Sequence, residues 1–160
     1  MKRVLVIGSP GAGKSTFAEQ LAVKSGLPLW HLDSIWHRAD RTTVSRDEFD
    51  RRLDYILSGD KWIVDGDYQR TLARRMERCD TLFFFNLPVD ECLAGAEARR
   101  GRRSIGMPWQ EDVPDENLRR AIMEYPERRR NFIEPLLQGF GGRIIRFSSR
   151  ADSDAYLSEL

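Results

Sequence analysis

The sequence predicts an α/β fold built on a parallel sheet, and two features indicate it. Short apolar runs alternate with longer segments whose apolar residues recur at helical spacing. A glycine-rich segment also follows the first apolar run directly. Because parallel strands need long crossover connections, helices between successive strands fit this order. With 160 residues, 41% of them hydrophobic, and no repeat or interdomain linker, we expect a single domain over residues 1–160.

The individual elements can be placed from local signals. The first crossover, residues 15–24, has its apolar side chains at helical spacing. In the second crossover, Ser45 and Glu48 have the spacing of a capping box, so a helix is expected to follow. Pro88 suits the first position of a helix over residues 89 to about 100. Five runs bounded by turn or polar residues are the expected strands, at residues 3–7, 29–32, 62–64, 82–85 and 144–147.

Residues 8–15 read GSPGAGKS and match the phosphate-binding loop pattern GxxxxGK[ST]. In such a loop, backbone N–H groups and the N-terminus of the next helix surround phosphate oxygens. Lys14 is expected to lay its ammonium across the β- and γ-phosphates, and the Ser15 hydroxyl to bind Mg²⁺. The residues assigned to nucleotide binding are Gly8, Pro10, Gly11, Ala12, Gly13, Lys14, Ser15 and Thr16.

A glycine-rich turn without a ligand is the alternative interpretation of this segment. It requires that Lys14 and Ser15 stand at their positions by accident, although a strand-like run precedes them and a helix-like run follows. The motif in this context therefore predicts a triphosphate site that works with Mg²⁺.

Polar side chains follow the next three predicted strands. Asp33 follows the second strand, Asp65 the third and Asn86 the fourth. Ligands of parallel sheets lie beyond the carboxyl ends of the strands, so these side chains are candidates for the site. Asp65 is the candidate Mg²⁺ ligand, and Asp33 is free to orient an attacking hydroxyl and take its proton. The alternative for either aspartate is a helix cap or a turn residue.

Two arginine clusters flank a polar stretch that we interpret as a lid over approximately residues 101–116. The first is Arg99, Arg100, Arg102 and Arg103, of which Arg99 and Arg103 are assigned to stabilising the transferring phosphoryl group. The second, residues 128–130, lies on the far side of the lid. The alternative for both clusters is a solvated helix face paired with local glutamates.

Composition excludes several classes of function. A net charge of +1, from 26 basic and 25 acidic residues, gives no electrostatic case for wholesale binding to nucleic acid or an anionic membrane. Cys79 and Cys92 have neither zinc-site nor disulfide-framework spacing. No leader is apparent and no apolar run approaches about 18 residues. We therefore expect a soluble, unprocessed protein of the cytoplasm.

Beyond these local signals, several segments resemble one family. The phosphate loop, the HLDSIW and WIVDGDY segments, FFFNLP and the first arginine cluster resemble the adenylate-kinase-like P-loop proteins, over nearly the whole chain. The combination of Asp33, Trp36 and WIVDGDY is most similar to the small group of DNA topology modulation proteins. Shikimate and gluconate kinases are more distant relatives.

The resemblance implies a P-loop NTPase fold with five parallel strands in the order 2-3-1-4-5, covered by helices and completed by a short lid. It implies that an acceptor binds between the second and third strands, where Asp33 meets it, with Trp36 and Arg70 as further contacts. It also implies that Arg150, after the fifth strand, contacts the adenine. The segment after Trp36 does not reproduce the AMP-binding residues of adenylate kinases, so AMP is not implied as the acceptor.

Two classes of function stay open. The first is a kinase that moves the γ-phosphoryl group of Mg²⁺-ATP to a small acceptor, such as a nucleotide, a nucleoside or another hydroxyl compound. The second is an ATPase or nucleotide-dependent regulator linked to DNA topology, although no helix-turn-helix, basic stripe or finger motif supports it. The expected partners are ATP and the acceptor, without a membrane, for a monomer or homodimer; nucleic acid stays open as a partner of the second class.

Overall fold

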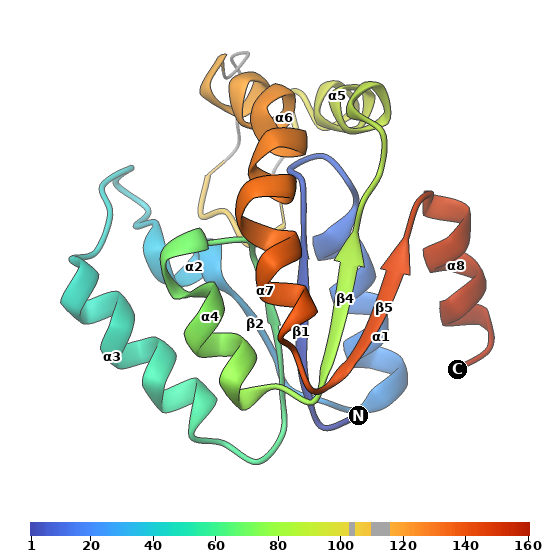
Figure 1. Cartoon of the computed structure of the whole chain (residues 1–160). Helices are drawn as coiled ribbons and strands as arrows, with labels where there is room; N and C mark the ends of the chain where they lie inside the picture. Colours follow the sequence, from blue (N-terminus) through green and yellow to red (C-terminus); the bar gives the residue numbers. More distant parts are fainter. Residues whose placement is uncertain (103–104, 110–115) are drawn as a thin grey trace.

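Five strands pair in parallel and form one sheet in the computed structural model, which describes residues 1–102, 105–109 and 116–160. Their order is β2-β3-β1-β4-β5, which confirms the order that the resemblance implied (Figure 1). The strands are β1 (Arg3–Gly8), β2 (Leu29–His31), β3 (Trp62–Asp65), β4 (Thr81–Phe85) and β5 (Arg143–Phe147).

The register of the sheet brings the strand ends that carry polar residues together. Asp65, at the end of β3, is opposite Val6 of the central strand β1 and opposite His31 of β2. The phosphate loop follows β1, and Asp33 lies two residues beyond His31. The loop and both candidate aspartates therefore stand at the same edge of the sheet, where ligands of parallel sheets bind.

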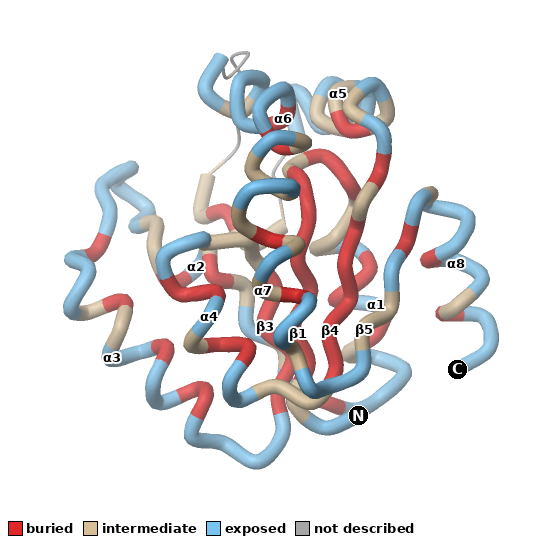
Figure 2. The backbone as a smooth tube through the Cα atoms, in the orientation of Figure 1, coloured by how far each residue is buried: buried red, intermediate tan, exposed pale blue. Residues whose placement is uncertain are grey.

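Helices cover both faces of the sheet, and alternate residues of each strand point to opposite faces. In β1, Leu5 and Ile7 belong to the core cluster shared with α3, α4 and α7, whereas Val4 and Val6 belong to the cluster shared with α1, α5 and α8. The central strands are buried along their length (Figure 2). The helices are α1 (Lys14–Ser25), α2 (Leu32–Trp36), α3 (Arg46–Leu57), α4 (Gln69–Arg78), α5 (Val89–Ala98), α6 (Glu116–Arg128), α7 (Glu134–Gln138) and α8 (Arg150–Ser158).

Local details refine the sequence-based elements. The Ser45 side chain accepts from the Glu48 backbone N–H at 3.1 Å, which confirms the predicted start of α3. Leu32 was expected in a strand but is the first residue of α2, where its side chain is buried in the core. Pro88 is the N-cap of α5, with an extended backbone, and Val89 is the first helical residue.

The long C-terminal helical segment is interrupted. Pro126 lies inside α6, and the chain continues as a π-helix, η1 (Arg129–Ile133), before α7. Proline lacks an N–H donor and clashes with the preceding turn, so a local change in helical hydrogen bonding is expected near it. Arg128 is the last residue before the wider turn.

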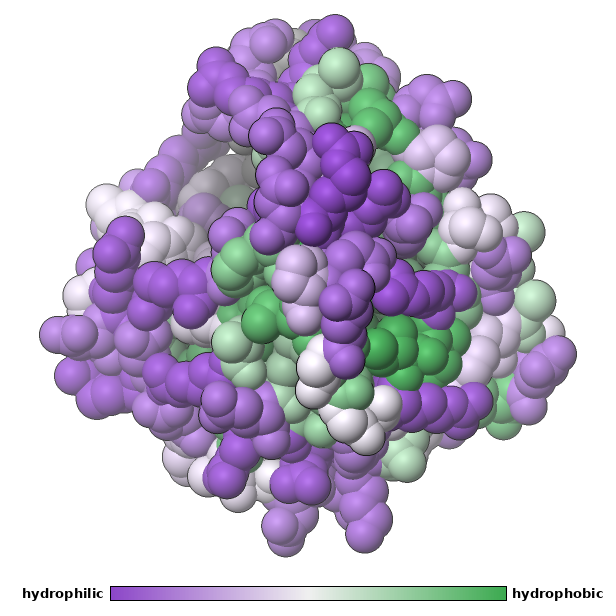
Figure 3. All heavy atoms as spheres, viewed as in Figure 1, coloured by the Kyte–Doolittle hydropathy of each residue, from purple (hydrophilic) through white to green (hydrophobic). Residues whose placement is uncertain are grey.

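The side chains on the visible face of the molecule are mostly hydrophilic (Figure 3), which agrees with the many charged residues in the sequence. Hydrophilic side chains cover α3 and α6 in the view of Figure 3, and hydrophobic ones show around β5. Cys79 is partly buried and Cys92 is buried, and both are free thiols. No helix within the described part of the chain is both long and apolar enough to cross a membrane.

Candidate functional site

The phosphate loop has the backbone that its glycines predicted. Gly11 has φ +78°, and a Cβ atom there would lie 2.1 Å from the Cys92 carbonyl oxygen of α5, so a larger residue cannot be accommodated. Gly13, also left-handed, caps α1 without a side-chain hydrogen bond. The first N–H groups of α1 therefore stay available to an anion.

Lys14 and Ser15 stand at the start of α1 and face the strand ends. The Lys14 ammonium donates to the Ser9 carbonyl oxygen at 2.9 Å, across the mouth of the loop. The Ser15 hydroxyl donates to Asp65 Oδ2 at 2.6 Å. The two residues assigned to Mg²⁺ are thus in direct contact.

Asp65 is suited to hold a divalent cation together with Ser15. The residue is 4% exposed, and its Oδ1 is buried without a hydrogen-bond partner among the described residues. No group of three or more His, Cys, Asp or Glu side chains that could hold a metal occurs within residues 1–102, 105–109 and 116–160. Mg²⁺ commonly binds through one or two protein oxygens, with phosphate oxygens and water completing its shell, so Ser15 and Asp65 fit it.

His31 is a second partner of Asp65 that the sequence reasoning did not assign. Its Nδ1 lies 2.8 Å from Asp65 Oδ2, and its Nε2 lies 3.9 Å from Glu19 Oε1. Burial lowers the pKa of His31, but the hydrogen bond and charge of Asp65, followed by the charge of Glu19, outweigh burial and raise it. His31 and Ser15 therefore both contact Oδ2 of Asp65, and together they orient the carboxylate.

Asp33 is positioned by a tyrosine. Tyr68 donates its hydroxyl hydrogen to Asp33 Oδ1 at 2.6 Å, and its ring stacks on Phe49 with centroids 5.3 Å apart. Burial and the neighbouring Asp33 raise the pKa of Tyr68 far above its ordinary value, so the phenol stays a donor. The contact occupies one oxygen of Asp33 and holds the carboxylate toward the cleft.

A further ion pair joins the loop after β3 to α6. Arg128 Nη2 donates to Asp67 Oδ2 at 2.6 Å and to the Asp67 carbonyl oxygen at 2.9 Å. Burial raises the pKa of Asp67, while the charges of Arg128, Lys14 and Arg75 oppose that rise. The pair ties the helix that follows the predicted lid to the strand-end loop.

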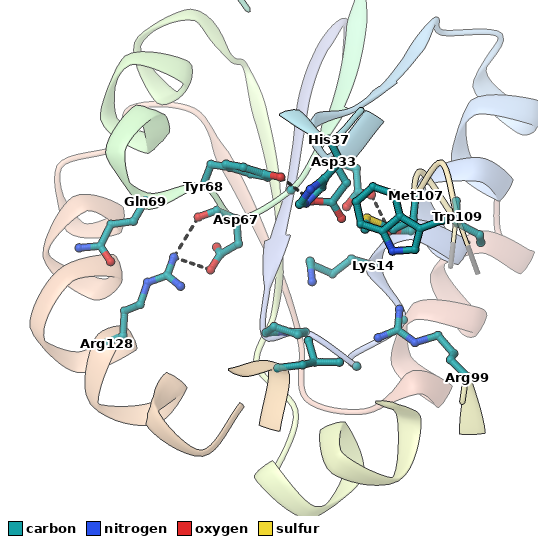
Figure 4. A pocket seen from close by; sticks show the side chains of 18 residues that line it. Lys14, Asp33, His37, Asp67, Tyr68, Gln69, Arg99, Met107, Trp109 and Arg128 are labelled. Carbon is teal, nitrogen blue, oxygen red and sulfur yellow. Dashed lines mark hydrogen bonds and ion pairs between the residues drawn. The ribbon is translucent and has the colours of Figure 1, made fainter. Parts of the chain in front are cut away.

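Apart from His31, the residues of these pairs at the strand ends line one cleft with a volume of about 540 Å³. In Figure 4, Asp67 and Arg128 lie on one side of Lys14, and Trp109, which is beside His37, lies on the other. The His37 and Trp109 rings meet edge to face with centroids 5.3 Å apart. The lining residues include Pro10, Gly11, Gly13, Lys14, Ser15, Asp33, Asp65, Asp67, Tyr68, Arg99 and Arg128. Most of the predicted nucleotide and metal residues therefore share a cavity with Asp33.

Other predicted site residues lie elsewhere. Trp36 packs edge to face on Phe49, and Arg70 forms a bidentate pair with Asp50 at 2.7 and 3.0 Å. Both line a smaller pocket of about 250 Å³, which shares the walls Tyr68 and Gln69 with the cleft. Their predicted contact with an acceptor would use this second pocket.

The remaining residues that were predicted to bind the nucleotide do not line the cleft. Gly8 and Ala12 are buried in the phosphate loop, and Thr16 is exposed on α1. Arg150 donates from Nη2 to the Gly11 carbonyl oxygen at 2.7 Å. Contact of Arg150 with adenine stays a prediction.

The lid arginines separate into different environments. Arg99 lines the cleft, whereas Arg100 pairs with Glu97 on the helix surface at 3.1 Å, as the solvated alternative predicted for that residue. Arg103 lies outside the described residues, as do residues 104 and 110–115 of the predicted lid. In the second cluster, Arg128 reaches the cleft and Arg129 bonds Asn86.

Solved structures provide the comparison for this arrangement. A shikimate kinase from Bacteroides thetaiotaomicron superposes with a TM-score of 0.67 at 18% identity, covering 99% of this chain and 95% of that one. A shikimate kinase from Acinetobacter baumannii, solved with shikimate, gives a TM-score of 0.63 at 19% identity, covering 99% and 92%. The chain has the P-loop NTPase fold.

Sequence comparison adds no family to this result. No protein-family model and no curated protein matches the chain. The likeness to the DNA topology modulation proteins therefore stays a prediction, whereas the P-loop fold rests on the sheet order and the two kinase structures.

Proposed function

We propose that this chain is a Mg²⁺-dependent kinase that transfers the γ-phosphoryl group of ATP to a hydroxyl group of a small acceptor. The observation that carries the proposal is that two hydrogen-bonded pairs, Ser15 with Asp65 and Tyr68 with Asp33, line the same cleft. The first pair joins the phosphate loop to the carboxylate at the end of β3, and the second presents a carboxylate that could act as a base. The two shikimate kinase structures add support through their fold.

The donor side of the cleft would hold the triphosphate. The N–H groups of the loop and of the first turn of α1 would bind phosphate oxygens, and Lys14 would exchange its bond to the Ser9 carbonyl for the β- and γ-phosphates. Ser15 and Asp65 would hold Mg²⁺, which supplies positive charge to the β- and γ-phosphates. Arg99 lines the same cleft and would stabilise charge on the transferring group, together with Arg103.

The acceptor side would supply the base. Tyr68 occupies Asp33 Oδ1, which leaves Oδ2 for the hydroxyl of the acceptor. The hydroxyl oxygen would form a bond to the γ-phosphorus as the bond from that phosphorus to the β,γ-bridging oxygen breaks, and the hydroxyl proton would pass to Asp33. The products would be ADP and a phosphate ester.

The test is release of ADP from Mg²⁺-ATP by the purified protein. Nucleosides, nucleoside monophosphates, sugars, hydroxy acids and duplex DNA would be supplied in parallel. We expect one class of small hydroxyl compound to stimulate ADP release, and Lys14→Ala to lower the rate by about 10²-fold or more. Lys24→Ala, an exposed lysine in the last turn of the same helix, is the matched control and should leave the rate unchanged.

Two results would contradict the proposal. Stimulation by DNA alone, or slow hydrolysis that no small molecule stimulates, would favour the ATPase or regulator that the sequence left open. Undiminished turnover by a folded Lys14→Ala variant would show that Lys14 of the phosphate loop does not take part in the reaction.

A further inference from the structure

Arg75 of α4 is a charged side chain in the interior of the protein. It is 0% exposed, and among the described residues Asp65 is the other charged side chain classed as buried. Burying a guanidinium is costly unless its donors are satisfied by hydrogen bonds. The partners that satisfy Arg75 therefore indicate what the residue holds in place.

All three nitrogens of Arg75 bind oxygen atoms near the end of β3. Nη1 donates to the Gly66 carbonyl at 2.8 Å, Nη2 to the Tyr68 carbonyl at 2.8 Å, and Nε to Thr71 Oγ1 at 3.2 Å. Thr71 lies one turn before Arg75 on the same side of α4. The two carbonyls flank Asp67, so the guanidinium fixes the backbone on both sides of that residue.

The loop held in this way, residues 65–68, carries three groups of the cleft. Asp65 bonds Ser15, Asp67 bonds Arg128, and Tyr68 bonds Asp33. A rotation of the peptide units at either carbonyl would redirect Asp67 and Tyr68 together. The loop also packs on α2, because a Cβ atom added at Gly66 would lie 3.0 Å from Cβ of Leu32, the neighbour of Asp33.

We propose that Arg75 is a positioning residue for phosphoryl transfer, which fixes residues 65–68 so that the metal side and the acceptor side of the cleft keep their relative geometry. This role rests on the proposed kinase function. The role requires a guanidinium, because its three nitrogens bind three separate oxygen atoms. A lysine side chain has a single nitrogen and cannot replace all three contacts. Burial lowers the pKa of Arg75 to about 10, which leaves it protonated at neutral pH.

The experiment compares Arg75→Lys with Arg78→Lys, an exposed arginine in the last turn of the same helix. Amide hydrogen exchange of the loop is measured first, because it does not depend on turnover. The Gly66 N–H donates to the Val6 carbonyl, and the Thr71 N–H to the Tyr68 carbonyl. In Arg75→Lys we expect both amides to exchange about tenfold faster or more, with the amides of β4 unchanged.

Steady-state kinetics separate positioning from stability. With an acceptor that the wild type phosphorylates, we expect Arg75→Lys to lower kcat by about tenfold or more, while the KM for ATP stays within about twofold. Arg78→Lys should resemble the wild type in both measurements. If the wild type phosphorylates no acceptor, the kinase proposal fails. In that case the hydrogen exchange rates of the Gly66 and Thr71 amides still test whether Arg75 holds the loop.

Two results would overturn the proposal. One is unchanged exchange at Gly66 and Thr71 in a folded Arg75→Lys variant. The other is an equal increase in β1, β4 and the loop, which shows general destabilisation. If Arg75→Lys does not fold, Thr71→Val, which removes the partner of Nε and keeps Arg75, replaces it. The same local increase is then expected to a smaller extent, and its absence rejects the proposal.

Discussion

Tyr68 and Asp33, 35 residues apart in the chain, are joined by a 2.6 Å hydrogen bond from the tyrosine hydroxyl to Asp33 Oδ1. The bond connects the loop after β3 with the first turn of α2. It lies at the edge of the sheet where β1 ends and the phosphate loop begins. The proposed base is therefore oriented by the same loop that carries the proposed metal ligand Asp65.

Removing this hydroxyl should affect the acceptor and spare ATP. A hydrogen bond to a charged group contributes about 1.5–3 kcal/mol, so Tyr68→Phe is expected to lower kcat/KM for the acceptor roughly 10- to 100-fold. The KM for ATP should not change. Tyr55→Phe, on an α3 tyrosine that is 76% exposed, is the control. Equal losses for ATP and acceptor would show that Tyr68 serves the fold and not Asp33.

His31 should tune the affinity of the site for Mg²⁺ through Asp65. Loss of a partner that orients a metal ligand typically weakens metal binding about 10- to 100-fold. In calorimetric titrations, Mg²⁺ should tighten the binding of ADP, and the Mg²⁺ concentration at half of the full effect can be measured. We expect this concentration to be about tenfold higher in His31→Ala than in the wild type. ADP binding without Mg²⁺ should stay the same. An unchanged Mg²⁺ dependence would mean that Ser15 alone fixes the carboxylate.

Gly95 of α5 marks the close packing of that helix on the phosphate loop. A Cβ atom there would lie 2.2 Å from the Gly11 carbonyl oxygen and 2.2 Å from Arg150 Nη2. Alanine normally stabilises a helix relative to glycine. Here overpacking of about 1–3 kcal/mol should displace the loop, and ADP affinity should fall roughly 10- to 100-fold in Gly95→Ala.

Gly141→Ala is the matched control, because no heavy atom lies within 4 Å of the position of its added Cβ. It should bind ADP like the wild type. Wild-type affinity in Gly95→Ala would instead show that the loop adapts to the added methyl group.

Stability at acid pH should report the ion pair between α7 and β5. The Arg146 guanidinium bonds both carboxylate oxygens of Glu134, at 2.7 and 2.9 Å, and lowers the pKa of Glu134 from its ordinary value of 4.5. Because the folded pKa is the lower one, the stabilisation is present above pH 4.5 and is lost as pH falls through the folded pKa.

The free energy of unfolding in urea, compared between wild type and Glu134→Gln, measures this contribution. Both side chains are partly exposed, so the difference at pH 7 should be below about 1 kcal/mol, and it should shrink toward zero as pH falls through the folded pKa of Glu134. A difference that grows on acidification would have the wrong sign for this pair.

The features that the sequence predicted are those encoded by short-range patterns. GSPGAGKS fixes a turn and a helix start within eight residues, and Asp33 and Asp65 follow apolar runs that could be recognised as strands. Because the carboxyl ends of parallel strands lie at one edge of the sheet, the loop and both aspartates come together there without any knowledge of side-chain packing. These signals are enough to predict that the phosphate loop and the two aspartates share one edge of the sheet.

The missing features depend on contacts between distant segments. Arg75 stands among several arginines of a polar helix, and nothing in the local pattern separates the buried one from its exposed neighbour Arg78. Tyr68, two residues after Gly66, and His31, on a half-exposed edge strand, gain their roles only when β2 and β3 pair. Trp36 was assigned as an acceptor contact because it lies just past Asp33, and Arg70 because of the resemblance. Both line the smaller pocket beside the cleft.

The central claim is transfer of the γ-phosphoryl group to a hydroxyl that Asp33 deprotonates. The most direct measurement is ³¹P NMR of the reaction of Mg²⁺-ATP with the stimulating acceptor, for wild type and Asp33→Asn. We expect ADP and a phosphate ester to appear in equal amounts, at a rate about 10²- to 10⁴-fold lower in Asp33→Asn, with ADP binding preserved. Inorganic phosphate as the sole phosphorus product besides ADP, or an undiminished rate in Asp33→Asn, would contradict the account.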